Sequence, residues 1–220
     1  MNSTGLFSAF RSDVRDEVTP FLWSNADLAR YADAAQIEFC KLEGGVADSS
    51  TTAVTQVPVV DGEAFAALHP SILKVRHARL QSDGRELTIL NLEDLQTRPD
   101  CTGRTFIATG VVHSMVLGME TNKARWFNIP VADDTVLLTV NRKPLTRITG
   151  PGIDLEIEED HHEYLLLWMK YMAHMKQDAE TYDKGRADSF KMQFEEYCRQ
   201  AKSDRERREH KFRVMAYGGY

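Results

Sequence analysis

The sequence is poor in cysteine and has no long apolar run. Its three cysteines, Cys40, Cys101 and Cys198, lie far apart and form no CxxC pair, so we interpret them as reduced thiols. No stretch approaches the about 20 apolar residues that a membrane-spanning helix needs. The first residues also lack the charged-then-apolar pattern of an export signal. We therefore expect a protein made in the cytoplasm, with no membrane partner.

Several motifs of enzymes and nucleotide-binding proteins are also missing. Neither of the glycine-rich phosphate loops GxxxxGK[ST] and GxGxxG occurs, and no GxSxG nucleophile motif is present. The tryptophans Trp23, Trp126 and Trp168 are too dispersed to form a base-stacking platform. The composition, 42% hydrophobic and 27% charged over 220 residues, is that of an ordinary soluble protein with one domain or two small ones.

The net charge of −6 is distributed unevenly. Residues 199–213 hold seven basic and three acidic residues, a local charge of +4, which leaves −10 for the rest of the chain. An acidic body argues against a protein that grips nucleic-acid phosphates over its whole surface. It fits a protein that meets other proteins, or one that borders DNA without holding it.

Helical patterns dominate the two ends of the sequence. Apolar residues at steps of three and four predict two helices, over 164–175 and 187–201, joined by a polar turn in which Gly185 is a C-cap or turn glycine. The Met-rich face of this hairpin suits repacking on assembly and equally an ordinary core. Ser24 and Gly44 bound another helix over 26–42. Residues 1–12 are predicted to be a loose lead, with a first helix starting near Ser12.

The middle of the sequence alternates in the manner of strands. We predict strands over 54–59, 72–80, 86–90, 125–129 and 135–141, a strand pair within 104–117, a short helix over 91–96, and a helical turn over 64–68. Ser82-Asp83-Gly84-Arg85 is a hairpin signal. Strands flanked by helices indicate the α+β class, here a helical bundle with an inserted antiparallel β-module. The expected divisions are 1–45, 46–151, 152–202 and an arm over 203–220.

One acidic cluster contains imidazoles. Residues 158–163 read EEDHHE, and His174 follows, so a metal or acid–base site using His161, His162 and His174 is one interpretation. Against it, His162 and His174 are twelve residues apart, roughly 18 Å along a helix. Acidic residues at a helix N-terminus are explained by the helix dipole. We therefore predict no catalytic, cofactor or metal residues.

The arm over 203–220 is basic and then aromatic. Its sequence SDRERREH is followed by apolar and aromatic residues spaced by glycines. Aromatic anchors beside basic residues are typical of a segment that docks on a partner. Plain disorder is the other interpretation, and the pattern leaves both open.

The layout of residues 12–201 resembles the head-to-tail adaptors (connector, tail tubular protein A) of tailed bacteriophages, above all short-tailed ones. Four segments carry the resemblance: LWSNADL at 22–28 leading into YADAAQ at 31–36, ILKV at 72–75 after His-Pro, VLLTVNRKP at 136–144, and IEEDHHEYL at 157–165 before the helical pair. The family often has Asn where Asp33 stands, and residues 100–120 match no family segment.

The resemblance implies a virion structural protein at the capsid vertex, without enzymatic activity or cofactor. Copies would form a ring, expected to be a dodecamer, between the portal protein and a tail nozzle or tail tube protein, with viral DNA passing through the lumen without sequence-specific binding. The arm would thread into the portal. Its expected portal-docking residues are the anchors Phe212, Tyr217 and Tyr220 and the charge partners Arg205, Arg207 and Arg208.

Three other functions fit parts of the sequence. A head-completion or tail-completion protein of another tailed phage would share the layout. A metal-dependent hydrolase would use the His161/His162 acidic cluster. A DNA-binding regulator would use the basic arm, and would bind duplex in a salt-sensitive way.

Overall fold

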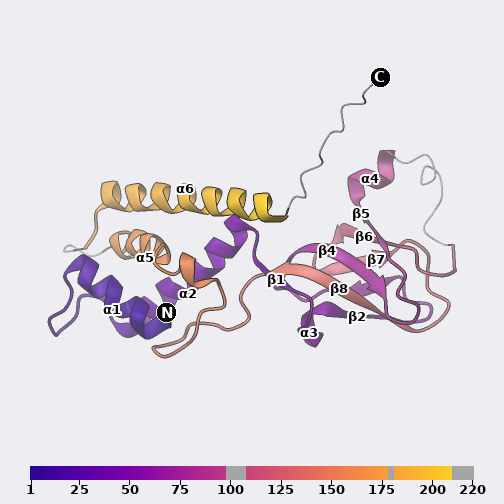
Figure 1. The fold of residues 1–220 in the computed structure, drawn as a ribbon, viewed down its shortest axis with the longest axis horizontal. Helices are drawn as coiled ribbons and strands as arrows, with labels where there is room; N and C mark the ends of the chain where they lie inside the picture. The colour runs from indigo at the N-terminus through magenta and orange to yellow at the C-terminus, as the bar shows by residue number, and fades with distance from the viewer. Residues whose placement is uncertain (98–107, 178–180, 210–220) are drawn as a thin grey trace, which may run out of the picture. The chain divides into compact units, whose positions relative to one another are not determined.

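A computed structural model describes residues 1–97, 108–177 and 181–209 (Figure 1). The chain divides into two compact units. Met1–Gly44 and Pro144–Tyr220 form a helical unit, and Gly45–Lys143 forms a β-rich unit between them in sequence. The predicted α+β class, with a β-module inserted between helices, is confirmed.

Four helices build the core of the helical unit: α1 (Ser3–Val14), α2 (Asn25–Glu43), α5 (Leu165–His174) and α6 (Lys184–Glu209). Helix α2 packs against the other three, and α5 lies beside α6. Ser24 caps α2 by accepting a hydrogen bond from the backbone N–H of Asp27, and Gly44 ends it, as predicted. Large side chains from each helix meet inside the unit, with Phe10, Phe39, Met169 and Phe194 almost fully buried.

The predicted helical hairpin is confirmed, but its turn is shorter than expected. Helix α6 begins at Lys184, so Gly185 is a residue of its first turn and neither a C-cap nor a turn glycine. Asp183 explains the early start, because its carboxylate accepts a hydrogen bond from the backbone N–H of Arg186 at 3.0 Å. This contact supplies an N-cap two residues before the glycine.

The prediction of a loose lead over residues 1–12 is wrong. These residues form α1, whose N-cap Asn2 accepts a hydrogen bond from the backbone N–H of Gly5. The helix ends at Arg15, which adopts a left-handed conformation with φ of 59°, so the helix expected near Ser12 does not exist. Burial of Leu6 and Phe10 against α2 and α5 stabilises the segment, which local propensity alone does not favour.

The β-rich unit contains two sheets. In the first, the central strand β8 (Asp134–Arg142) pairs from Val136 to its end with β4 (Ile72–Leu80). On its other side it pairs with β1 (Val46–Asp48) and then with β2 (Gln56–Val59). All of these pairs are antiparallel, and the strand predicted over 135–141 is confirmed.

The second sheet has the order β3-β7-β6-β5. Its strands are β3 (Phe65–Ala67), β5 (Thr88–Asn91), β6 (Ser114–Glu120) and β7 (Lys123–Trp126). The β5–β6 pair is parallel, so this sheet is mixed. Both sheets contribute to one core, in which Trp126, Met115 and Val136 are fully buried.

Local predictions inside this unit were partly wrong. Residues 65–67 form strand β3 instead of a helical turn, because backbone pairing with β7 outweighs their alanine-rich helix propensity. Thr52–Thr55 form the short helix α3 just before β2. The hairpin at Gly84 is present, but after a bridge at Glu86 the chain leaves β4 and enters the second sheet. The short helix α4 (Leu92–Thr97) is confirmed, and the strand pair predicted within 104–117 lies partly outside the described residues.

Within the described ranges, none of the helices combines the length and apolarity that a bilayer crossing demands.

Candidate functional site

The imidazoles of the acidic cluster hold the helical unit together. The short 3-10 helix Glu159–His161 precedes α5, and His161 Nδ1 shares a hydrogen bond of 2.7 Å with the Tyr197 hydroxyl on α6. Burial raises the pKa of Tyr197 to about 12, so the phenol stays neutral at physiological pH. His162 is buried and donates from Nε2 to the carbonyl of Ile157.

His174 lies at the other end of α5, where it donates from Nδ1 to the carbonyl of Thr181 at 3.2 Å. Its ring stacks on that of Phe190, at 5.8 Å between centroids. Among residues 1–97, 108–177 and 181–209, no group of three or more His, Cys, Asp or Glu side chains is arranged to hold a metal ion. The three histidines therefore stand in separate packing environments, and do not converge on one site.

The end of α6 divides the three predicted arginines of the arm. Arg205 is largely buried and donates from Nη1 to both carboxylate oxygens of Glu43 on α2, at 3.0 and 3.1 Å, and from Nε to Glu209. Burial lowers the pKa of Arg205, but its bonds to the two glutamates outweigh that effect and raise it. Arg207 and Arg208 are mostly exposed, with only loose contacts to Asp204 and Glu158.

Arg205 is thus a structural clamp that holds α6 against α2, whereas Arg207 and Arg208 present positive charge to solvent. The residues expected to be aromatic docking anchors, Phe212, Tyr217 and Tyr220, lie outside the described residues. The site that the structure describes is therefore the charged, exposed end of α6 from which the arm continues.

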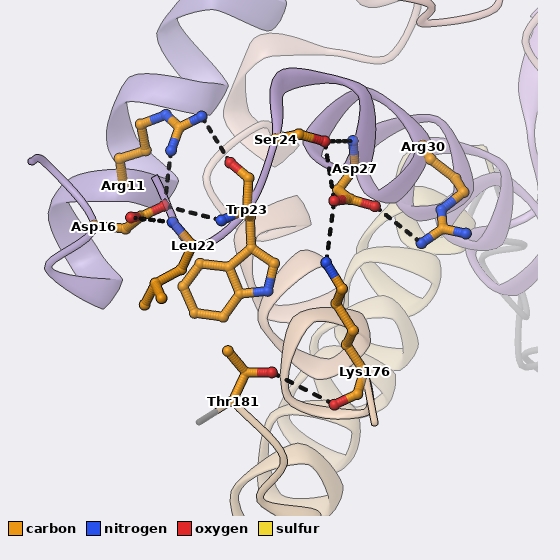
Figure 2. Close-up of polar contacts among 9 residues, drawn as sticks. All are labelled: Arg11, Asp16, Leu22, Trp23, Ser24, Asp27, Arg30, Lys176 and Thr181. Carbon is orange, nitrogen blue, oxygen red and sulfur yellow. Dashed lines mark hydrogen bonds and ion pairs between the residues drawn. The ribbon is translucent and has the colours of Figure 1, made fainter. Parts of the chain in front are cut away.

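Besides the end of α6, the helical unit has a loop of defined conformation, the α1–α2 loop, residues 15–24 (Figure 2). The carboxylate of Asp16 is almost fully buried and accepts from Arg11 Nη1 at 2.7 Å and from the backbone N–H groups of Leu22 and Trp23. Arg11 also donates to the carbonyl of Trp23 and stacks on the ring of Phe21, with 3.6 Å between the guanidinium carbon and the ring centroid. These contacts fix the loop in one shape.

The start of α2 is joined to the end of α5 by charge (Figure 2). Asp27 accepts from Ser24 Oγ and from Lys176 Nζ at 3.3 Å, and pairs with Arg30. Burial raises the pKa of Asp27, but these hydrogen bonds and the neighbouring cations outweigh it and hold the pKa below its usual value. The hydroxyl of Thr181 donates to the Lys176 carbonyl, which closes the end of α5.

Between these contacts and the middle of α2 lies a groove of about 650 Å³, called here the α2–α5 groove. Its apolar surface includes Trp168, Tyr171 and Met172 of α5, Met175 directly after that helix, and Ala34 and Ile37 of α2. Its charged edge is formed by Arg30, Asp33, Glu38, Lys41, Arg147 and Lys176. The Met-rich face of the hairpin is thereby divided, because Met169 is core, Met172 and Met175 line the groove, and Met192 is exposed.

Sequence reasoning missed both the loop and the groove. The signal for the loop was the pairing of two opposite charges, Arg11 and Asp16, around an exposed Val-Thr-Pro-Phe-Leu run. Asp33, noted where the family often has Asn, accepts from the backbone N–H of Ile148 and from Arg147, so its charge serves a pair that Asn cannot form.

Comparison with known proteins gives one result. The family model described as SU10 adaptor protein matches residues 1–215, which is nearly the whole chain and includes both units. No curated protein matches the chain. The resemblance to phage adaptors that four segments of the sequence carry is thus confirmed over a longer range than 12–201. The chain belongs to the SU10 adaptor protein family, a family of phage adaptors.

Proposed function

We propose that the protein docks under the phage portal as a ring of identical copies and connects the capsid to the tail around the DNA channel. Its family supports a phage head-to-tail adaptor role, a place in the virion and a structural activity rather than catalysis. The portal contact, a ring of about twelve copies, a tail protein below the ring and the passage of DNA go beyond the family assignment.

The observation that carries the portal contact is the construction of α6. Its body is anchored by buried Phe194, Cys198 and Ala201, and its last turns by the pair between Arg205 and Glu43. Beyond this clamp Arg207 and Arg208 are exposed. A helix anchored in this way, with two exposed arginines near its end, gives a partner a fixed and positively charged surface, and the cations steer the encounter.

The distribution of charge supports the channel role. The chain outside residues 199–213 carries −10, and DNA phosphates gain no counterion release from an acidic wall. A lumen of this kind lets DNA slide without sequence-specific contacts. Binding of duplex by the isolated protein is therefore expected to be negligible at physiological salt.

The first experiment measures the mass of the purified protein in solution, alone and with a portal ring from the same phage. We expect a stable assembly of portal and many copies of this chain. Truncation after Glu209 keeps the Arg205–Glu43 clamp and removes Phe212, Tyr217 and Tyr220, and we expect it to abolish that assembly. Portal binding by the truncated protein at wild-type strength would contradict the proposed role of the arm.

Reversing the charge of the exposed arginines at the end of α6 tests whether they steer portal binding, without changing the fold of the helix. Arg207→Glu combined with Arg208→Glu is expected to slow portal binding and to remove most of its salt dependence. The matched control is Arg199→Glu, an exposed arginine of the same helix that pairs with Glu196, and it is expected to bind portal as wild type does. Equal effects of the control and the double variant would mean that the end of α6 has no special role.

A further inference from the structure

Two surface features of the helical unit have complementary shape and chemistry. The first is the α1–α2 loop, which exposes Val18 by 80%, Leu22 by 50% and Phe21 by 40%. Apolar side chains with such exposure are normally found on mobile segments, but this loop is fixed by the buried Arg11–Asp16 pair. A preformed apolar tip loses little conformational entropy when a partner covers it.

The second feature is the α2–α5 groove, whose apolar lining is unpartnered in the single chain. Aromatic and methionine side chains, which adapt well to a docked segment, form most of that lining. The volume of about 650 Å³ accommodates a few side chains of a loop, but not a whole helix. The groove therefore suits a short, apolar, protruding segment.

The charge directly beside the apolar tip of the loop is opposite in sign to the charge at the edge of the groove. Each cation at the edge of the groove pairs with a carboxylate that is more buried than itself, as with Arg147, exposed by 67% against 9% for its partner Asp33. The same order holds for the pairs of Arg30, Lys41 and Lys176. The edge thus presents positive charge outward. On the loop, Glu17 is exposed directly beside Val18, and within the described residues it has neither a hydrogen-bond nor an ion-pair partner. The exposed cation of the loop, Arg15, lies at the end of α1, three residues before Val18.

We infer that the α1–α2 loop of one copy docks into the α2–α5 groove of the next copy, with Val18, Phe21 and Leu22 on the apolar lining and Glu17 at the cationic edge. The contact joins two different surfaces of one protein, so it is heterologous and propagates from copy to copy until the ring closes. It deepens the proposed function, on which it rests, by naming the contact between neighbours.

The contact also explains why assembly would need the portal. One loop in one groove buries less than the about 1,200 Å² that standard stable interfaces reach. Each contact is then weak alone, and it becomes effective when the portal holds neighbouring copies at high local concentration. A monomer in solution and a ring on the portal are the expected states.

Cross-linking between two chains, each with one introduced surface cysteine, tests the contact. One chain carries Val18→Cys and the other Met172→Cys, both with Cys101→Ser, while Cys40 and Cys198 are buried. The chains are assembled together on portal rings and treated with a short bismaleimide. We expect covalent dimers from the mixture and none from either chain alone. No dimers from the mixture, or dimers from the Val18→Cys chain alone, would overturn the inference.

Substitutions give a second readout. Val18→Asp and Ala34→Arg, which charge the tip and fill the groove, are each expected to lower the number of copies per portal at least tenfold at a fixed concentration. Val131→Asp, at an exposed valine of the β-rich unit, is the matched control and is expected to assemble normally. Normal assembly of Val18→Asp would refute the contact. If only Ala34→Arg lost assembly, the contact would also be refuted, and a segment of the portal would be the occupant of the groove. Failure of wild type to bind portal would instead refute the proposed function.

Discussion

Replacing Asp16 by alanine should destabilise the protein and remove the contacts that fix the conformation of the α1–α2 loop. The carboxylate is 3% exposed and accepts three hydrogen bonds, one from Arg11 and two from the backbone of residues 22 and 23. Its loss leaves the guanidinium of Arg11, itself 11% exposed, without its anion. Truncation of one partner of a buried pair costs about 3–5 kcal/mol, because the remaining charge stays desolvated.

The measurement is chemical denaturation followed by circular dichroism at the helical signal, which reports mainly on the helical unit. At about 3 °C per kcal/mol, the same loss corresponds to a thermal midpoint lowered by roughly 10–15 °C. Asp16→Asn, which keeps an acceptor oxygen but no charge, should fall between wild type and Asp16→Ala. Below its midpoint, Asp16→Ala should also fail in portal-templated assembly, since the loop loses its shape.

Glu195→Ala is the matched control. Glu195 also pairs with a cation, Lys191 on the same helix α6, but both side chains of that pair are exposed, by 50% and 43%. Exposed pairs contribute at most about 1 kcal/mol. If Asp16→Ala and Glu195→Ala lost the same stability, the buried Arg11–Asp16 pair would not be what holds the loop, and the argument from burial would be refuted.

Three further predictions concern stability. Burial raises the pKa of Asp48, but hydrogen bonds from Arg142 and from the backbone at 50 and 51 hold it well below its usual value. The ionised carboxylate therefore contributes its full stability above about pH 4, and this contribution is lost as the pH falls below that. The difference in unfolding free energy between wild type and Asp48→Asn should therefore shrink when unfolding is measured at successively lower pH. Arg205→Ala should cost about 2–4 kcal/mol in urea unfolding, because Glu43 stays buried without its cation. Gly45→Ala should cost about 1–3 kcal/mol in thermal unfolding, since φ is +86° and the added Cβ would lie 2.7 Å from the carbonyl oxygen of Arg142.

The helices were predictable where their patterns were long. The hairpin of α5 and α6 and the capped helix α2 follow from apolar spacing and from Ser24 and Gly44, which are local signals. Helix α1 was missed, although Leu6, Phe7 and Phe10 share one face and Asn2 is a good cap. Its serines, threonine and glycine suggested a loose segment, and the packing that stabilises it is not a local property.

The sheets were less predictable because their pairing is long-range. Strand β8 was evident from its alternation, but its partners β1, β2 and β4 lie up to 96 residues away in sequence, as with Val46 and Arg142. The hairpin at Gly84 predicts a returning strand that pairs with β4. Instead, the chain leaves β4 after one bridge at Glu86 and forms β5, which pairs in parallel with β6 of the other sheet. The loop and the groove depend on which charges become buried, which composition alone does not reveal.

The pairing of β1 with the end of β8 has a consequence for how this protein can change. Val46 lies directly opposite Arg142, so the two points where the β-rich unit joins the rest of the chain are neighbours on adjacent strands. Because its two ends are adjacent, the β-rich unit can be exchanged, enlarged or replaced by a short linker, while the order of the helices in the helical unit stays the same. Recombination between phages can therefore exchange the two units of the protein independently.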